Sequence, residues 1–234
     1  MLAGVRFLPQ PKTQNPKLVK TSLPRLLCLL ALAGLTLPTL NAGAEFLLAP
    51  LARAFGAPPE SELARCRVAF QGLQRQLGSS RVVVEPVYFV DGHKRSWRPD
   101  LADAICREAG THTGARFAVA AAKPQVGPAR LGHNQLRYLW NRAGDYSSWV
   151  KTSRPGGDYV WFVEIWGHDG KVGAIHVYVF DPAGQVAYCR LFNSHHFGDH
   201  FPQEGGDAVR LIVDDFFRNL ARDPKSVFPP YGVG

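Results

Sequence analysis

Apolar positions in the first half of the chain recur with the spacing of alternating helices and strands. Across 61–77 they fall at three- and four-residue steps, which predicts an amphipathic helix. The β-branched and aromatic run at 81–90 predicts a strand, in which Pro86 fits an edge or a bulge. Residues 98–110 predict a second helix, with Pro99 at its first position.

The second half of the chain adds most of the strands. We expect a short strand at 116–122, a helix at 134–144, three strands at 158–166, 173–181 and 185–192, and a closing helix at 207–223. The turn sequences GHDGK and DPAG separate the three strands, which therefore form an antiparallel meander. The order predicts an α+β fold with a mixed sheet of about five strands. A right-handed β-α-β crossover precedes the meander, and helices pack against the sheet.

The first 44 residues have the pattern of a secretory leader. Five basic residues and no acidic residue precede an apolar run at 26–40, and Ala-Gly-Ala at 42–44 fits the rule for signal peptidase cleavage. The apolar run is shorter than the roughly 20 residues of a membrane-spanning helix. We therefore expect a signal peptide at 1–44 and a periplasmic or secreted mature protein. An uncleaved anchor is the alternative.

The leader accounts for most of the positive net charge of the chain. The whole chain has 27 basic and 19 acidic residues, a net charge of +8. Without the leader, 22 basic and 19 acidic residues remain, a net charge of +3. The basic character therefore does not indicate nucleic-acid binding. We expect a lead-in segment at 45–60, one domain at 61–222 and a tail at 223–234.

Three cysteines remain outside the leader: Cys66, Cys106 and Cys189. An oxidising compartment would allow one disulfide and leave one free thiol. The sequence does not decide whether any pair forms.

The element order resembles one family of envelope proteins. The strand containing VVVEP, the helix containing DLADAI, the strand DYVWFVEIW and the last meander strand GQVAYCRLF are followed by a helix at 208–220. Over about 80–222, this order resembles the amino-terminal domain of the Tol–Pal translocation protein B and the core of the curli secretion channel protein. The resemblance implies a largely non-enzymatic protein that binds other proteins or assembles. It does not imply a pore, because nothing here matches the membrane hairpins of the curli channel.

One candidate site lies in the meander. Glu164, His176 and Arg190 are polar residues within three apolar strands. Hairpins centred on Gly170 and Ala183 would place the three side chains in one row across the sheet. The row is either a charged patch that binds a ligand or the solvated face of a half-covered sheet.

A candidate contact residue precedes the meander. Trp149 lies in DYSSWVKTSRPGG, which we expect to be an exposed loop. Such a loop can contact a partner. Alternatively, the indole packs back onto the core.

The segment NSHHFGDHFPQEGGD at 193–207 contains the densest cluster of possible metal ligands: His195, His196, Asp199 and His200. Adjacent residues of an extended chain point to opposite faces, which separates His195 from His196. We expect a connection between a strand and a helix, with Gly206 or Asp207 capping the helix. A zinc site with three ligands and a water molecule is the alternative.

These patterns together predict an exported, non-enzymatic binding or assembly module of the cell envelope. Its expected partner is an envelope protein or a second copy of the chain, without a cofactor, nucleic acid or a membrane span after cleavage. The alternative is a small exported metal-binding protein or hydrolase that uses the histidine-rich loop.

Overall fold

The computed structural model describes residues 58–128, 134–194, 198 and 201–228, which all belong to one compact unit, Leu47–Gly234. The predicted signal peptide, most of the predicted lead-in and residues 229–234 lie outside the described residues. The elements are α3 (Glu60–Gln76), η1 (Leu77–Ser79), β1 (Arg81–Val84), β2 (Val87–Asp91), β3 (Lys94–Arg98), α4 (Pro99–Gly110), β4 (Arg116–Val119), α5 (Gln135–Ser153), β5 (Tyr159–His168), β6 (Lys171–Phe180), β7 (Val186–Asn193), α7 (Gly205–Leu220) and α8 (Pro224–Val227).

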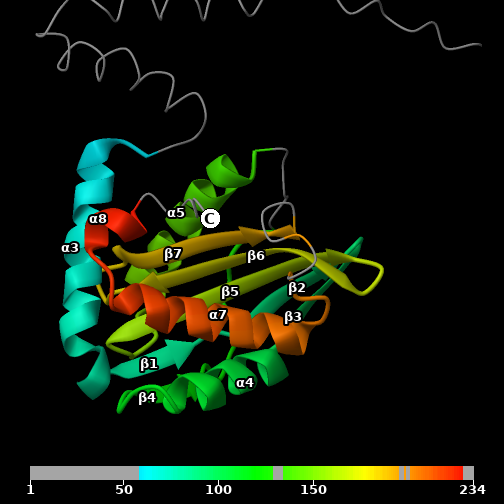
Figure 1. The fold of residues 1–234 in the computed structure, drawn as a ribbon, viewed down its shortest axis with the longest axis horizontal. Helices are drawn as coiled ribbons and strands as arrows, with labels where there is room; N and C mark the ends of the chain where they lie inside the picture. Colours follow the sequence, from blue (N-terminus) through cyan, green and yellow to red (C-terminus); the bar gives the residue numbers. More distant parts are fainter. Residues whose placement is uncertain (1–57, 129–133, 195–197, 199–200, 229–234) are drawn as a thin grey trace, which may run out of the picture. The chain divides into compact units, whose positions relative to one another are not determined.

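The strands form one mixed seven-stranded sheet, which confirms the predicted α+β class (Figure 1). β5, β6 and β7 pair antiparallel as the predicted meander. On its other edge β5 pairs in parallel first with β1 and then with β2. β4 lies parallel beside β1, and β3 lies antiparallel beside β2. The strand count exceeds five because the predicted strand at 81–90 is two strands and β3 was not foreseen.

The junction of β1 and β2 is an irregularity at Glu85 and Pro86. Val84 pairs with Trp161 and Tyr88 with Glu164, so three residues of one strand span the length of two residues of β5. Proline has no N–H to donate to a ladder, which makes it suitable for such a bulge. The extra residue places Val84 and Tyr88 on opposite faces of the sheet.

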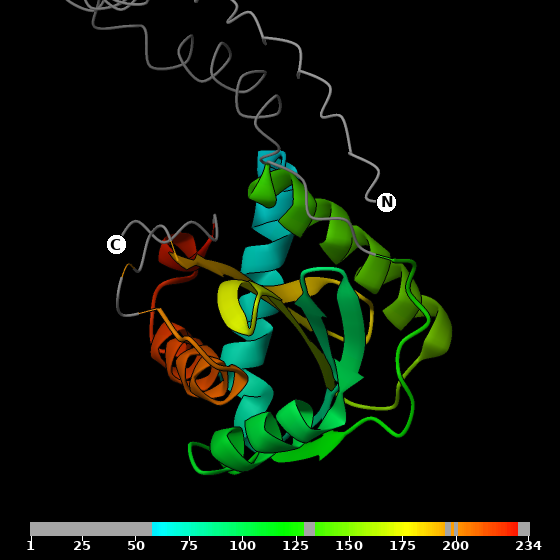
Figure 2. The same ribbon diagram turned by 90° about the vertical axis from the view of Figure 1, so that its right-hand side faces the viewer.

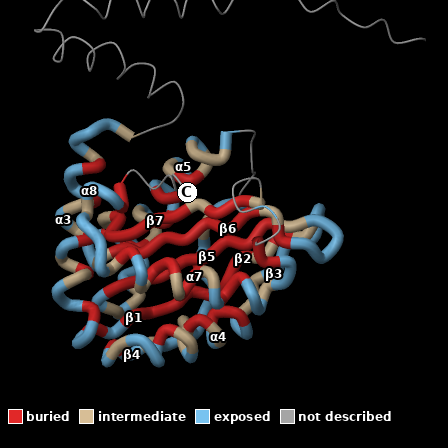
Figure 3. The backbone as a smooth tube through the Cα atoms, in the orientation of Figure 1, coloured by how far each residue is buried: buried red, intermediate tan, exposed pale blue. Residues whose placement is uncertain are grey.

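Helices cover both faces of the sheet. Figure 2 shows α5 on one side of the strands and α7 with α4 on the other. α3 packs beside β7, where Phe70 stacks on Tyr188 with ring centroids 6.3 Å apart. The meander strands β5, β6 and β7 are consequently buried along most of their length (Figure 3). This corrects the interpretation of the meander as half-covered, because α5 shields the face that was expected to be solvated.

α5 is longer than the predicted helix at 134–144. The Asn134 side chain accepts a hydrogen bond from Arg137 N at its start, and the helix ends where Arg154 adopts a φ of 45°. Gly144 lies on the exposed side, where a glycine weakens a helix without breaking it. Trp149 therefore belongs to the helix, and the prediction of an exposed loop is wrong. Its half-buried indole packs edge-on against Phe162 at 5.7 Å.

The end of the chain contains more structure than expected. α7 begins at Gly205 after Glu204 as the capping residue, so Gly206 and Asp207 are not caps. The predicted tail at 223–234 includes α8 and the buried Phe228, whose ring contacts Phe70 at 6.1 Å. Within the described ranges, no helix combines the length and the apolar character needed to cross a bilayer.

Candidate functional site

The strand register brings together two of the three predicted row residues. Glu164 on β5 is directly opposite His176 on β6, as predicted, and Oε2 of the glutamate lies 3.4 Å from Nδ1 of the histidine. Both side chains are 0 % exposed. The pair is therefore a buried element of the structure and not part of an open polar face.

Arg190 does not join this pair, so the predicted three-residue row is wrong. The turn between β6 and β7 has the expected centre, but Ala187 forms a bulge that shifts the register by one residue. Arg190 then pairs with Val177, and its side chain points to the opposite face. A shift of one residue moves every later side chain of a strand to the other face.

The partners of Glu164 come from α5. Arg142 Nε and Tyr146 Oη each donate to Oε1 at 2.7 Å, and Tyr138 Oη donates to Oε2 at 2.7 Å. These three residues follow one another at four-residue steps and so share one face of the helix. We call the set Glu164, His176, Tyr138, Arg142 and Tyr146 the Glu164 network. The recurrence of Tyr, Arg and Tyr at 138, 142 and 146 is the sequence signal that was missed.

The network compensates the charge of its central carboxylate. Burial on its own raises the pKa of Glu164, but the hydrogen bond and charge of His176 and the Arg142 guanidinium outweigh it and hold this pKa at about 2. Burial and the nearby carboxylate raise the pKa of Tyr146 well above its usual value. The Arg142 guanidinium also lies 4.5 Å from the Tyr146 ring centroid and donates to Gly127 O at 2.9 Å. Ionised Glu164 thus has a full set of donors.

A carboxylate beside an imidazole is also the geometry of a catalytic base. Nε2 of His176 is buried and has no hydrogen-bond partner among the described residues. However, a general base must lie within hydrogen-bond reach of a substrate proton. His176 lies fully buried beneath α5, with the Tyr138 ring centroid 5.0 Å away. In this conformation both side chains of the pair are enclosed by protein groups.

Arg190 belongs to a second polar group on the α7 face. Its Nε lies 3.3 Å from Oδ2 of Asp215, which also accepts hydrogen bonds from Tyr188 Oη and Asn219 Nδ2 at 2.8 Å. All four side chains are buried or nearly so. This group connects β7 to α7.

The predicted metal ligands lie between β7 and α7 in the sequence. His195, His196, Asp199 and His200 lie outside the described residues. Among the residues that are described, no group of three or more His, Cys, Asp or Glu side chains has the arrangement of a metal site.

The three described cysteines lack the environment that lowers the thiol pKa of a catalytic nucleophile. Cys66, Cys106 and Cys189 are free cysteines. Burial raises the pKa of Cys66 to about 12 and that of Cys106 to about 11. Cys189 is fully buried, and burial raises its thiol pKa well above the usual value. A nucleophilic cysteine needs the opposite shift.

A cleft of about 550 Å³ opens at the tips of two hairpins. The tips are joined by a hydrogen bond from Gly92 N to Gly167 O at 3.0 Å and by another from Gly170 N to Asp91 Oδ1 at 3.2 Å. The exposed basic side chains of the two tips are His93, Lys94, Arg95, His168 and Lys171. We call these five residues the hairpin-tip surface.

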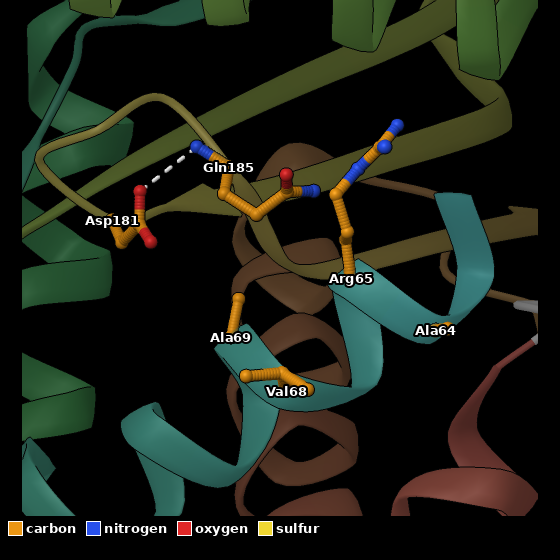
Figure 4. A pocket seen from close by; sticks show the side chains of 6 residues that line it. All are labelled: Ala64, Arg65, Val68, Ala69, Asp181 and Gln185. Carbon is orange, nitrogen blue, oxygen red and sulfur yellow. Dashed lines mark hydrogen bonds between the residues drawn. The ribbon is translucent and has the colours of Figure 1, made fainter. Parts of the chain in front are cut away.

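A smaller apolar groove of about 370 Å³ lies between α3 and the β6–β7 turn (Figure 4). Val68 in this groove is 66 % exposed. The turn beside it is held by a hydrogen bond from Gln185 N to Asp181 Oδ1 at 2.8 Å. Nothing in the structure indicates what covers this groove.

Comparison with models of protein families and with curated protein sequences gave no match.

Proposed function

We propose that this chain is an exported, non-enzymatic binding or assembly module of the cell envelope. The observation that carries the proposal is the Glu164 network. The residues best suited to acid–base chemistry, Glu164 and His176, are fully buried and engaged with α5. The leader pattern at 1–44 supports export, and the resemblance to Tol–Pal and curli components supports an envelope role.

The hairpin-tip surface is the binding face in this proposal. Asp91 is engaged by Gly170 N, and Asp169 lies 3.2 Å from His168. Lys94, Arg95 and Lys171 form no ion pair with any residue in the described parts of the chain. Unpaired basic side chains around a cleft favour a partner with an acidic surface.

The same region includes an exposed sheet edge. Among the described strands β3 pairs only with β2, and its first three residues are exposed. An edge strand offers free backbone groups to another chain, and charged residues restrict which chain can pair there. The exposed Lys94 and Arg95 therefore select for an acidic partner rather than preventing all contact.

Charge reversal tests the proposal. The tip variant is Lys94→Glu, Arg95→Glu and Lys171→Glu in the mature protein. The control variant is Lys123→Glu, Lys151→Glu and Lys225→Glu, which changes the net charge by the same amount at exposed positions elsewhere. Tagged forms of the wild type and both variants are incubated with envelope extracts, and bound proteins are identified. Size-exclusion chromatography of each form measures self-association.

We expect one acidic envelope protein, or a second copy of the chain, to bind the wild type and the control variant but not the tip variant. Binding should also weaken as salt is raised. Equal binding by the tip variant would show that the hairpin-tip surface is not the binding face. A chain that stays monomeric and captures no protein would contradict the binding-module proposal itself.

A further inference from the structure

A separate hollow of about 370 Å³ lies over β1 and β4, beside the end of α5. Arg81, Val83 and Glu85 line it on one side, and the consecutive residues 118–122 line it on the other. Trp149 and Ser153 of α5 and the following Pro155 complete the lining. None of these residues belongs to the Glu164 network or to the hairpin-tip surface.

The size of the hollow follows from the pattern of large and small residues in β4. Val83 pairs with Ala118 and Val84 with Val119 in the parallel register. The larger Phe117 and Val119 pack against the main core. Side chains alternate between faces along a strand. Ala118 therefore lies on the other face, and together with the alanines at 120–122 it lines the hollow with small side chains that leave space.

Glu85 stands at one end of this hollow, directly after β1. Its side chain is 1 % exposed, and neither carboxylate oxygen accepts a hydrogen bond from any described residue. Burying an ionised carboxylate without a partner costs several kcal/mol. Burial raises the pKa of Glu85 to about 7. Glu164 is equally buried, but both of its carboxylate oxygens accept hydrogen bonds. Those of Glu85 accept none from any described residue.

We propose that the hollow binds a small organic cation, a primary amine with an apolar body, whose ammonium group hydrogen-bonds to Glu85. An ammonium group brings three donors and a positive charge to the unpaired carboxylate. The valine, alanine and tryptophan lining suits an apolar body. The site also lies at the carboxyl ends of parallel strands, where open sheets commonly bind ligands.

Other ligand classes fit less well. An anion would be repelled by Glu85. A hard metal ion needs about six oxygen ligands, whereas the lining offers one carboxylate and the Ser153 hydroxyl. Arg81 begins β1, four residues before Glu85, and therefore lies roughly 13 Å from it along the extended chain. It makes that end basic, so the ammonium end of a ligand is directed to Glu85.

Phenethylamine and its neutral twin 2-phenylethanol are suitable probes. Each is titrated by calorimetry and by NMR, up to about 10 mM, into the mature wild type, Glu85→Gln and Ala120→Leu proteins. Glu85→Gln keeps the shape of the side chain and removes its charge. Ala120→Leu fills the hollow and leaves Glu85 in place. Circular dichroism and thermal unfolding verify that each variant is folded.

We expect the wild type to bind the amine at least about tenfold more tightly than the alcohol. Glu85→Gln should remove this preference, and Ala120→Leu should abolish binding of both probes. Equal affinity of the wild type for the two probes would overturn the proposal. So would amine binding that is unchanged in Glu85→Gln, or no amine binding to the wild type over the whole range.

Discussion

Glu164 and His176 face each other across β5 and β6, and solvent reaches neither side chain. Through Tyr138, Arg142 and Tyr146, the same carboxylate binds three successive turns of α5. A pair that resembles a surface cross-strand contact in sequence is therefore the attachment point of a helix. Because the pair attaches this helix, a substitution in it should lower the free energy of unfolding more than a substitution in a surface pair would.

We predict that Glu164→Gln lowers the free energy of unfolding by about 3 kcal/mol or more, because it leaves the Arg142 guanidinium buried without its anion. The half-covered sheet inferred from sequence would give at most about 1 kcal/mol. Urea unfolding distinguishes the two values. The double variant Glu164→Gln, Arg142→Met should lose less than the sum of the single losses. Additive losses would show that the two side chains are not coupled.

A smaller effect is expected for Arg190→Met. Asp215 keeps its hydrogen bonds from Tyr188 and Asn219, so the loss should be about 1–2 kcal/mol. A double-mutant cycle of Arg190 with Asp215 should give a clear coupling energy. The corresponding cycle with His176 should give none beyond about 0.5 kcal/mol. The reverse result would restore the three-residue row and refute the bulge at Ala187.

Glu85 should make stability depend on pH in an unusual direction. Its pKa is raised from 4.5 to about 7 in the folded protein. Between these values the folded state binds more protons than the unfolded state, so the free energy of unfolding falls as pH rises. Glu85→Gln removes this contribution. Relative to the wild type, the free energy of unfolding of the variant should rise by on the order of 2–3 kcal/mol between about pH 4.5 and pH 8.

Urea unfolding of both proteins at several pH values measures this difference. Contributions from all other titrating groups cancel between wild type and variant. A difference that stays constant across the range would show that the Glu85 carboxyl is not perturbed. Saturation of the hollow with an amine should reduce the difference, since the ligand stabilises the ionised form.

We predict no tight zinc site in the histidine-rich loop. Calorimetric titration of zinc into the mature protein should show no submicromolar binding, because the sequence predicts an extended segment at His195 and His196, in which adjacent side chains point to opposite faces. Tight binding that disappears when His195, His196 and His200 become alanine would contradict this prediction. It would support the alternative of a metal-binding protein or hydrolase.

Much of the fold was predictable because the apolar pattern is strong. The helix at 61–77, the helix at 98–110 and the meander lie within a few residues of α3, α4 and β5 to β7. β3 was missed because its sequence, KRSWR, has only one large apolar residue and lies on an exposed edge. The second half of α5 was missed because Gly144 and the serines after it resemble a loop in sequence.

The site was harder to predict than the fold, for a physical reason. The pairing of Glu164 with His176 was predicted from a hairpin centred on Gly170. The turn instead pairs His168 with Lys171, and a bulge at Gly173 restores the predicted register. The position of Arg190 depends on a bulge, and residues on both faces of β7 are buried, so no hydrophobic alternation marks the shift. The sequence could not show that the Glu85 carboxylate lacks hydrogen-bond donors, because this depends on which donors of the folded chain lie close to it.

The bulge at Glu85 and Pro86 reverses the alternation of side chains between β1 and β2. Because three residues there occupy the length of two on β5, Tyr88 pairs with Glu164 and faces α5. A strand that continued regularly after Val84 would pair Tyr88 with Ile165, and Tyr88 and Val90 would then face α4. The bulge therefore decides which side chains of β2 meet α5, and it places the Tyr88 ring 6.0 Å from the Arg142 guanidinium.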